Sequence, residues 1–593
     1  MDRLRQWEVW QLFSVLHRAE PKMSNAFWVL VVLRGALPAG FALAMGRLVS
    51  AVQNGDDLTS GLVAIGCVFV LMQSLGPIHN ALSSNLGASA SSWLHDRLLE
   101  ACTGPSGLAH LEDARLADRL STARDFDLGI TGPRMAVTIT HIGGGLAALF
   151  GGAFQMLLLF GYSWWAPLVV GGGWLSTHRL LRSGATWRGR TSEDVMEQQR
   201  QADYAYRLAV HDPAAKELRL FGLADWVVGG FAAVRHHLMD QSWAERRLHW
   251  RPTCLALALI AGANAVFFWS LAQSASSGSV TIGALVVYGQ AAIGTGTLAF
   301  GDLDWMLHTS AQPMPLVLGL LDDMASAGAL AEGHEPGAGL PRHDITFAGV
   351  GFAYPNAARK VFDDFDLTIP AGQSLAIVGQ NGAGKTTLAK LLCRLYDPDQ
   401  GRITVDGIDL RTIDIADWRR RVAAVFQDFV RYELTLRENV APTGADDEVI
   451  LAALADARAE GIAELDTVLA AGYEGGTDLS GGQWQRVALA RALAAVRLGA
   501  GVVILDEPTA QLDVRGEAEI FERLLEATRG CTTILISPRF STVRRADRIC
   551  VIEEGRVVEE GTHEELMARR GRYQTMFDLQ AARFDDPDAE VLT

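Results

Sequence analysis

The segment from Gly379 to Thr386 reads GQNGAGKT, which fits the glycine-rich pattern that cradles phosphate groups. It follows an apolar run at 374–378, suited to a buried strand, and precedes a helical pattern at 388–392. In this context backbone amides and the helix N-terminus can bind phosphate, Lys385 can reach the β and γ phosphates, and the Thr386 hydroxyl can ligate Mg²⁺. The expected nucleotide-binding residues are those of this segment and the threonine that follows it, namely Gly379, Gln380, Asn381, Gly382, Ala383, Gly384, Lys385, Thr386 and Thr387.

Two adjacent carboxylates follow a second buried-strand pattern. Residues 502–505 are apolar and favour β structure, and the chain continues with Asp506 and Glu507. We expect Asp506 to support the magnesium shell, and Glu507 to polarise a water molecule for attack on the γ phosphate. A surface acidic pair would not normally follow four consecutive β-favouring apolar residues. The pair therefore predicts nucleotide hydrolysis.

A third motif, LSGGQ at 479–483, opens a helical pattern at 484–494 and offers a serine and free amides to an anion. The three motifs in this order resemble those of the ATP-binding cassette (ABC) transporters. The resemblance implies that this signature binds the γ phosphate held by the opposite subunit, so that two cassettes clamp two ATP molecules head to tail. Dimerisation is therefore expected. The residues that would contact the partner's ATP are Ser480, Gly481, Gly482, Gln483 and Asp513.

The same resemblance assigns two further residues. Tyr354, in the sequence FAYP, would stack on adenine, and a tyrosine that only packs is the alternative. Gln427, in VFQD after an apolar strand, would contact Mg²⁺ or the attacking water and also a coupling helix of the membrane domain; the downstream TLRENV at 435–440 also matches the family. The implied magnesium ligands are Thr386, Gln427 and Asp506, and the implied catalytic residues are Glu507 and Gln427.

One position departs from the family pattern. Pro538 stands where a histidine is expected to contact the γ phosphate, and proline has neither an imidazole nor a backbone N–H to donate. We therefore expect slow hydrolysis at this chain's own site, while its intact signature at 479–483 could complete a partner's site. This asymmetry resembles heterodimeric exporters, although such chains often lose the glutamate that is present here as Glu507. The loop 510–513 also departs, and a homodimer with weak activity at both sites stays open.

Apolar composition divides the chain into a membrane half and a cytosolic half. Thirteen of the 15 tryptophans lie before residue 306, together with the long apolar stretches. A helix needs about 20 apolar residues to cross a bilayer. Core helices of a large soluble protein are the alternative, but they would give no cause for the charge asymmetry of the loops described next. Six candidate spans lie near 26–52, 60–82, 136–161, 163–182, 251–274 and 280–301.

Loop charges predict the orientation of these spans. The loops 53–59 and 273–280 carry no Lys or Arg, whereas 84–134 carries five arginines. The positive-inside rule then places both termini in the cytosol, with the chain in the cytoplasmic membrane. The first 20 residues contain no evident removable signal peptide.

The predicted domains are a transmembrane domain at 1–325, a linker rich in Ala and Gly at 326–343, and a nucleotide-binding domain at 344–593. The segments 108–120 and 211–221 occupy the places of coupling helices in similar transporters. In the second segment, an aspartate followed by a proline suits a helix start.

Ionisable residues within or near the spans are candidates for a role in transport. Asp304 and His308 share a helix face at the cytosolic end of span six. Our hypothesis is that Asp304 faces the central cavity and biases it toward cationic substrates. Interfacial solvation is the alternative explanation.

Taken together, these features predict a membrane all-α region of six helices, followed by an α/β P-loop NTPase cassette with a helical subdomain. We expect ATP-driven export of a small molecule, peptide or lipid by one half of a dimeric ABC transporter that uses ATP and Mg²⁺. Its partners would be a second half-transporter, the lipid bilayer and an unknown substrate. The net charge of −16 argues against a nucleic-acid partner, and the six cysteines show no paired or metal-type spacing. Alternatives are a regulatory nucleotide-binding subunit or an importer of the siderophore type; the spans argue against a soluble ATPase of the DNA-repair type.

Overall fold

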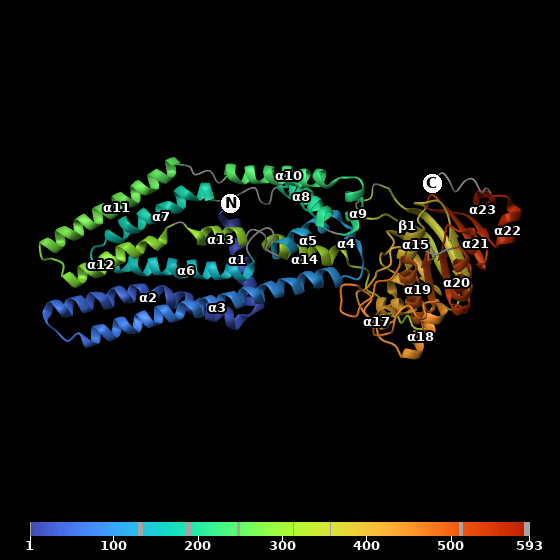
Figure 1. Cartoon of the computed structure of the whole chain (residues 1–593), viewed down its shortest axis with the longest axis horizontal. Helices are drawn as coiled ribbons and strands as arrows, with labels where there is room; N and C mark the ends of the chain where they lie inside the picture. The colour runs from blue at the N-terminus through green and yellow to red at the C-terminus, as the bar shows by residue number, and fades with distance from the viewer. Residues whose placement is uncertain are drawn as a thin grey trace. The chain divides into compact units, whose positions relative to one another are not determined.

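The structure is a computed structural model of the 593-residue chain. It describes every residue except 1, 128–133, 186–192, 211, 246–249, 300, 312–313, 356, 358, 509–513 and 586–593. The chain forms two compact units (Figure 1). The helical unit comprises Met1–Leu98 and Arg119–Leu320, and the α/β unit comprises Leu99–Asp118 and Leu321–Thr593.

Helices make up the described part of the helical unit (Figure 1). In chain order they are α1 (Asp2–Ala19), α2 (Pro21–Asn54), α3 (Thr59–Thr103), α5 (Ala114–Asp127), α6 (Met135–Leu158), η1 (Leu159–Gly161), α7 (Ala166–Ala185), α8 (Glu193–Val210), α9 (Asp212–Leu220), α10 (Ala224–Glu245), α11 (Trp250–Ser276), α12 (Ile282–Gly294), η3 (Thr295–Leu298), α13 (Asp302–Ala311) and α14 (Met314–Ala327). Of these, α3, α5 and α14 also contribute residues to the α/β unit.

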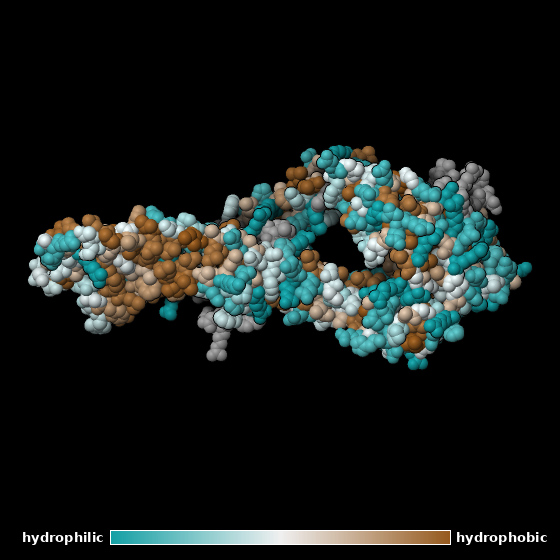
Figure 2. Space-filling view, turned by 90° about the horizontal axis from the view of Figure 1, so that it is seen from below, coloured by the Kyte–Doolittle hydropathy of each residue, from teal (hydrophilic) through white to brown (hydrophobic). Residues whose placement is uncertain are grey.

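Each of the six predicted spans coincides with a helix. Four of these helices, α2, α3, α11 and α6 with its extension η1, are long and apolar enough to cross a membrane. Large apolar side chains lie exposed on the helical unit, such as Phe69 and Trp269, which are 53% and 71% exposed. Figure 2 shows that hydrophobic residues gather over this unit, whereas hydrophilic residues dominate the cassette surface. An apolar surface of this extent indicates contact with lipid.

Of the remaining two spans, α7 has 20 residues, the same length as its predicted span 163–182, whereas α12 is shorter than the sequence suggests. The α-helix of span six ends at Gly294 and continues as the 3₁₀ turn η3 to Leu298. A Cβ at Gly294 would overlap the side chain of Gln155 on α6, so the helices approach closely at this glycine. The same close packing joins α2 to α12, because a Cβ on Gly46 would lie 2.9 Å from the Gly283 carbonyl oxygen.

The α/β unit contains two sheets. The antiparallel sheet has the order β2-β1-β4-β5. The larger sheet has the order β10-β9-β3-β8-β7-β6 and is parallel except for β10. The strands are β1 (Asp344–Phe352), β2 (Phe362–Pro370), β3 (Ser374–Val378), β4 (Gln400–Val405), β5 (Ile408–Asp409), β6 (Val422–Val425), β7 (Val502–Asp506), β8 (Thr532–Ile536), β9 (Arg548–Glu553) and β10 (Arg556–Gly561).

Helices pack on these sheets and enclose two apolar cores (Figure 1). Every residue of β7 and β8 is buried, which explains their unbroken apolar sequences. The helices of the α/β unit are α4 (Ala109–Glu112), α15 (Lys385–Leu392), η4 (Leu410–Thr412), α16 (Ile415–Arg421), α17 (Leu436–Val440), α18 (Asp447–Asp456), α19 (Gly481–Arg497), α20 (Val514–Ala527), α21 (Phe540–Val543), α22 (His563–Arg569) and α23 (Arg572–Asp585). The predicted fold class is confirmed.

Both predicted coupling helices fall on helical segments. The first, 108–120, is divided into α4 and α5 at Asp113, whose carboxylate accepts hydrogen bonds from the backbone N–H groups of Arg115 and Leu116 at 2.8 and 3.3 Å. The second corresponds to α9, which begins at Asp212 and is followed by exposed Phe221, while residue 211 and the side chain of Asp212, the predicted cap, lie outside what the structure describes.

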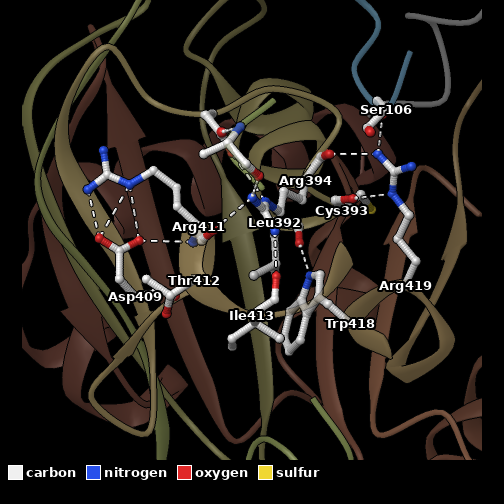
Figure 3. A network of polar contacts seen from close by, with 12 residues as sticks. Ser106, Leu392, Cys393, Arg394, Asp409, Arg411, Thr412, Ile413, Trp418 and Arg419 are labelled. Atoms are coloured by element: carbon white, nitrogen blue, oxygen red, sulfur yellow. Dashed lines mark hydrogen bonds and ion pairs between the residues drawn. The ribbon is translucent and has the colours of Figure 1, made fainter. Parts of the chain in front are cut away.

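A buried arginine organises the C-terminal end of α15 (Figure 3). Arg394 is 0% exposed, pairs with Asp397 and donates to the carbonyl oxygens of Ile413 at 2.7 Å, Arg411 at 3.0 Å and Ala331. This guanidinium therefore joins the helix to η4 and to the predicted linker. The domain boundaries proposed from the sequence stay a prediction.

Candidate nucleotide-binding site

The loop between β3 and α15 has the backbone that phosphate binding requires. Gly382 and Gly384 have φ angles of +82° and +103°, which residues with a side chain rarely adopt. A Cβ on Gly384 would lie 2.7 Å from the Phe362 ring, and a Cβ on Gly379 would lie 2.2 Å from the Ile552 carbonyl oxygen. The glycines therefore let the loop bend against its neighbours while the N-terminus of α15 stays open to an anion.

Lys385 is the cationic centre of this loop. Its Nζ donates to the carbonyl oxygens of Gly379 at 2.9 Å and Gln380 at 3.0 Å. Burial lowers the pKa of Lys385, although the carboxylates of Glu507 and Asp506 oppose the shift. When a nucleotide binds, phosphate oxygens could therefore take over the hydrogen bonds that the Lys385 ammonium now donates to these two carbonyl oxygens.

Thr386 and Asp506 meet as the sequence predicts. The Thr386 hydroxyl donates to Asp506 Oδ2 at 2.7 Å, and Asp506 is 2% exposed at the end of β7. Burial raises the pKa of Asp506 despite this hydrogen bond. A hydroxyl oxygen next to a buried carboxylate fits Mg²⁺, a hard cation that prefers oxygen ligands.

The predicted third ligand, Gln427, lies near the same sheet edge. It follows β6 by two residues and is exposed. Strand β6 pairs with β7 so that Val425 lies opposite Leu505, which places Gln427 beside the strand that ends in Asp506. Its role as a ligand stays a prediction.

Glu507 has a left-handed backbone with φ of +50°. Its N–H donates to the Ile536 carbonyl oxygen at 2.8 Å, and its own carbonyl oxygen accepts from Gln485 Nε2 at 3.5 Å. These contacts hold the residue in a conformation that is costly for a side-chain-bearing residue, as is common at functional sites. The sequence analysis missed Gln485, which is buried and lies two positions beyond Gln483 of the signature.

Tyr354 is engaged with side chains of the loop region. Its hydroxyl lies 3.0 Å from Thr387 Oγ1, and its ring packs edge-on against Phe352 and Tyr396 at 5.1 and 5.5 Å between centroids. Lys390 Nζ lies 5.1 Å from the ring centroid. Adenine stacking on Tyr354 stays a prediction. No sequence motif singled out Lys390 or Tyr396.

The signature motif forms the start of α19. Ser480 caps the helix: its hydroxyl accepts from the Gln483 N–H at 3.3 Å, and the Ser480 N–H donates to Gln483 Oε1 at 2.8 Å. Ser480 is exposed, and Gly481 and Gly482 are half-buried, so the helix N-terminus is accessible to an anion. Asp513 lies outside the described residues.

Pro538 follows β8 and Ser537, and its side chain is exposed. Gln580 of α23 donates from Nε2 to the Pro538 carbonyl oxygen at 2.6 Å and accepts from the Phe540 N–H at 3.1 Å. A cavity of about 330 Å³ separates Gly379 from this loop and α23. The position therefore offers no group that could donate to a γ phosphate, and its loop is fixed by a glutamine that the sequence analysis missed.

In the helical unit, Asp304 pairs with a residue of another helix. Its Oδ1 lies 3.3 Å from Nδ1 of His178 on α7, and the other His178 nitrogen lies 2.8 Å from the Leu298 carbonyl oxygen. The sequence analysis did not predict that a histidine of the same chain would contact Asp304. The side chain of His308 lies outside the described residues, and the cavity hypothesis for Asp304 stays untested.

Neutralising Asp506 is expected to stabilise the nucleotide-free protein. Because its folded pKa is raised above the usual 3.8, the folded state keeps this proton to a higher pH than the unfolded chain does. Stability is therefore lost as the pH rises through that interval and stays lost above it. In thermal unfolding without Mg²⁺, Asp506→Asn should melt about 2–4 °C above the wild type at pH 7.5, which corresponds to about 1 kcal/mol, with a smaller gain at pH 5. Asp578→Asn, on the exposed face of α23, is the control; equal melting of the two variants would contradict this account.

The fold and the site define a P-loop nucleotide-binding unit joined to a bundle of apolar helices. Residues 362–510 match the family model described as ABC transporter. The chain is 30% identical over 389 residues to the subtilin transport ATP-binding protein of Bacillus subtilis, covering 64% of this chain and 62% of that protein. It is 36% identical over 389 residues to the human mitochondrial potassium channel ATP-binding subunit, covering 61% of this chain and 52% of that protein. It thus spans less than two thirds of the length of these curated relatives.

A solved structure shares the fold across both units. The structure of a bacterial Atm1-family ABC exporter with ATP bound matches with a TM-score of 0.73 at 22% sequence identity, covering 94% of this chain and 99% of that one. The chain therefore has the ABC exporter fold, with a helical membrane-type domain fused to one cassette.

Proposed function

We propose that this chain is one half of a dimeric ABC exporter that couples ATP hydrolysis to transport of a small molecule, peptide or lipid. The observation that carries the proposal is the meeting of Lys385, Thr386 and Asp506 at one phosphate loop, with Glu507 next in the chain. When bound, Mg²⁺ would neutralise phosphate charge, with Thr386 and Asp506 holding it. Glu507 would hold and deprotonate the attacking water.

Dimerisation follows from the accessible signature. Among the described contacts, Ser480 and Gln483 bond to each other and not to the phosphate loop of their own chain. An exposed helix N-terminus is suited to the γ phosphate of a second cassette. On α9, Leu220 is 78% exposed, and Phe221, which follows it, is 66% exposed; we propose that they dock on the partner's cassette.

The membrane context supports export across the cytoplasmic membrane. The apolar helices would cross the bilayer with both termini in the cytosol, as the arginines of 84–134 suggest. The fusion of the helices to the cassette favours export over the importer alternative. The transported substrate would enter between the two helical domains.

The partner is proposed to be a different half-transporter. Pro538 supplies no donor for the γ phosphate, so two copies of this chain would carry two weakened sites. A partner with an intact histidine would use the signature of this chain to build one active site. A homodimer with weak turnover is the alternative.

Restoring the histidine tests this proposal. In the full chain purified into lipid nanodiscs, Pro538→His should raise ATP turnover by roughly tenfold, because the imidazole can hold the attacking water and donate to the γ phosphate. Pro442→His, at another exposed proline of the cassette, is the matched control. Full activity of the unmodified homodimer, or equal turnover of the two variants, would contradict the impaired site.

A regulatory role is the second candidate function. Pro538 and the similarity to a potassium channel ATP-binding subunit both favour it. In that case ATP binding at this chain would gate a partner without contributing turnover. The substitution of Glu507 described in the Discussion separates the two functions.

A further inference from the structure

The segment 99–118 is seated on the C-terminal end of α15, within the α/β unit. The Leu108 N–H donates to the Leu395 carbonyl oxygen at 3.0 Å, and Arg419 Nη2 donates to the Ser106 carbonyl oxygen at 2.6 Å (Figure 3). Leu108 also packs against the apolar core that contains β3 and α15. The segment thus contacts the helix whose opposite end carries the phosphate loop.

Within this segment, Glu112 of α4 contacts two side chains that follow the phosphate loop. Its Oε1 lies 2.8 Å from Lys390 Nζ, and its Oε2 accepts a hydrogen bond from the Tyr396 hydroxyl. Burial lowers the pKa of Lys390, but the hydrogen bond to Glu112 and nearby negative groups outweigh it, so the pKa is raised. The Lys390 ammonium is therefore charged at neutral pH.

Both partners of Glu112 also contact Tyr354. Lys390 Nζ lies 5.1 Å from the centroid of the Tyr354 ring, within the range of a cation–π interaction. The Tyr396 ring meets it edge-on, with 5.5 Å between centroids and an interplanar angle of 87°. Because the Tyr354 hydroxyl also lies 3.0 Å from Thr387 Oγ1, the ring is fixed on three sides by groups of the α15 region.

We propose that Glu112 is a positioning residue for Tyr354, so that seating of the segment 99–118 and occupation of the adenine position stabilise each other. The proposal rests on the proposed function, in which Tyr354 stacks on adenine. Linkage requires reciprocity: if the seated segment raises ATP affinity, ATP strengthens the seating of the segment by the same factor. This connection uses the base of the nucleotide, and it is separate from any contact that Gln427 makes with the phosphates or Mg²⁺.

A comparison of ATP with a ligand that lacks the base tests the proposal. Equilibrium binding of Mg–ATP and of Mg–tripolyphosphate is measured on the full chain in nanodiscs. Glu112→Gln should weaken ATP binding by about fivefold, a coupling in the usual range, and leave tripolyphosphate binding unchanged. Glu526→Gln, on the exposed face of α20, removes the same charge elsewhere on the cassette and should change neither affinity.

Hydrogen exchange supplies a second readout. In the wild type, ATP should slow amide exchange at residues 106–112 more than tripolyphosphate does, and Glu112→Gln should abolish that difference. If Glu112→Gln fails to fold, Lys390→Met carries the same test, with the same selective loss of ATP affinity expected.

Three outcomes would overturn the proposal: equal ATP affinity in the Glu112 and Glu526 variants, equal losses for ATP and tripolyphosphate, or no difference between the two ligands in exchange at 106–112. A wild type that binds and hydrolyses ATP while one of these outcomes holds leaves the proposed function intact. A wild type that does not bind ATP removes both.

Discussion

Replacing Glu507 with glutamine is expected to lower ATP turnover by about 10²–10³-fold and to leave ATP binding intact. An amide cannot take a proton from the attacking water, whereas it has nearly the shape of the carboxylate. The backbone contacts of Glu507 with Ile536 and Gln485 do not involve the side chain, so they should persist in the variant. Steady-state turnover and equilibrium ATP binding of the full-length protein in nanodiscs measure the two effects.

The chain offers a closely matched control for this substitution. Glu554 is also a glutamate with positive φ, at +48°, and it is exposed in the turn between β9 and β10. Glu554→Gln should therefore leave turnover unchanged. Because Pro538 is expected to slow the native site, both substitutions are also made in the Pro538→His background. If Glu507→Gln has no effect on ATP turnover in either background or in the assembled complex, the result supports the regulatory function and contradicts a catalytic role for Glu507.

Removing the buried guanidinium of Arg394 is expected to cause a large loss of stability. Arg394→Met would leave Asp397 without its ion-pair partner and would remove the donors to the buried Ile413 carbonyl oxygen and the part-buried Arg411 carbonyl oxygen. Breaking a buried, hydrogen-bonded charge network typically costs about 3–5 kcal/mol. For a domain of this size we expect the unfolding temperature of the cassette to fall by roughly 10 °C.

Thermal unfolding of the full chain, followed by a probe in the cassette, measures this loss. Arg529→Met, at an exposed position after α20, is the control, and it should change the melting temperature little. Similar melting of the two variants would show that the network in Figure 3 contributes no net stability. ATP at saturating concentration should raise the melting temperature of both variants, because it binds the folded state.

The strands and helix starts around the phosphate loop could be predicted because their sequence signals are local. A buried strand, a glycine-rich turn and a helix start lie within 20 residues of one another around Lys385. Thr386 comes after β3 and Asp506 ends β7, and both strands are central and parallel, so their carboxyl ends lie at the same edge of the sheet and the two side chains can meet. The capping box at Ser480 is also readable from the sequence, since its serine and glutamine lie three positions apart.

Contacts between distant residues could not be predicted in this way. The bond between Gln580 and Pro538 joins two elements 42 positions apart, and the pair of Asp304 with His178 joins helices separated by far more. The periodicity of a sequence predicts which face of a helix or strand is apolar, but it does not predict which distant polar side chains will contact each other. The division of the first coupling segment at Asp113 was missed for a related reason, because an aspartate inside a helical pattern reads equally well as a surface residue.

The 45-residue helix α3 also has a mechanical consequence. At about 1.5 Å per residue it is about 67 Å long, more than twice the ~30 Å thickness of the hydrocarbon core. The same uninterrupted rod supplies Leu98 to the helical unit and Leu99 to the α/β unit, with no hinge of irregular backbone at that junction. Bending of this helix is therefore expected at Pro77, where the proline removes a backbone hydrogen bond within the helix.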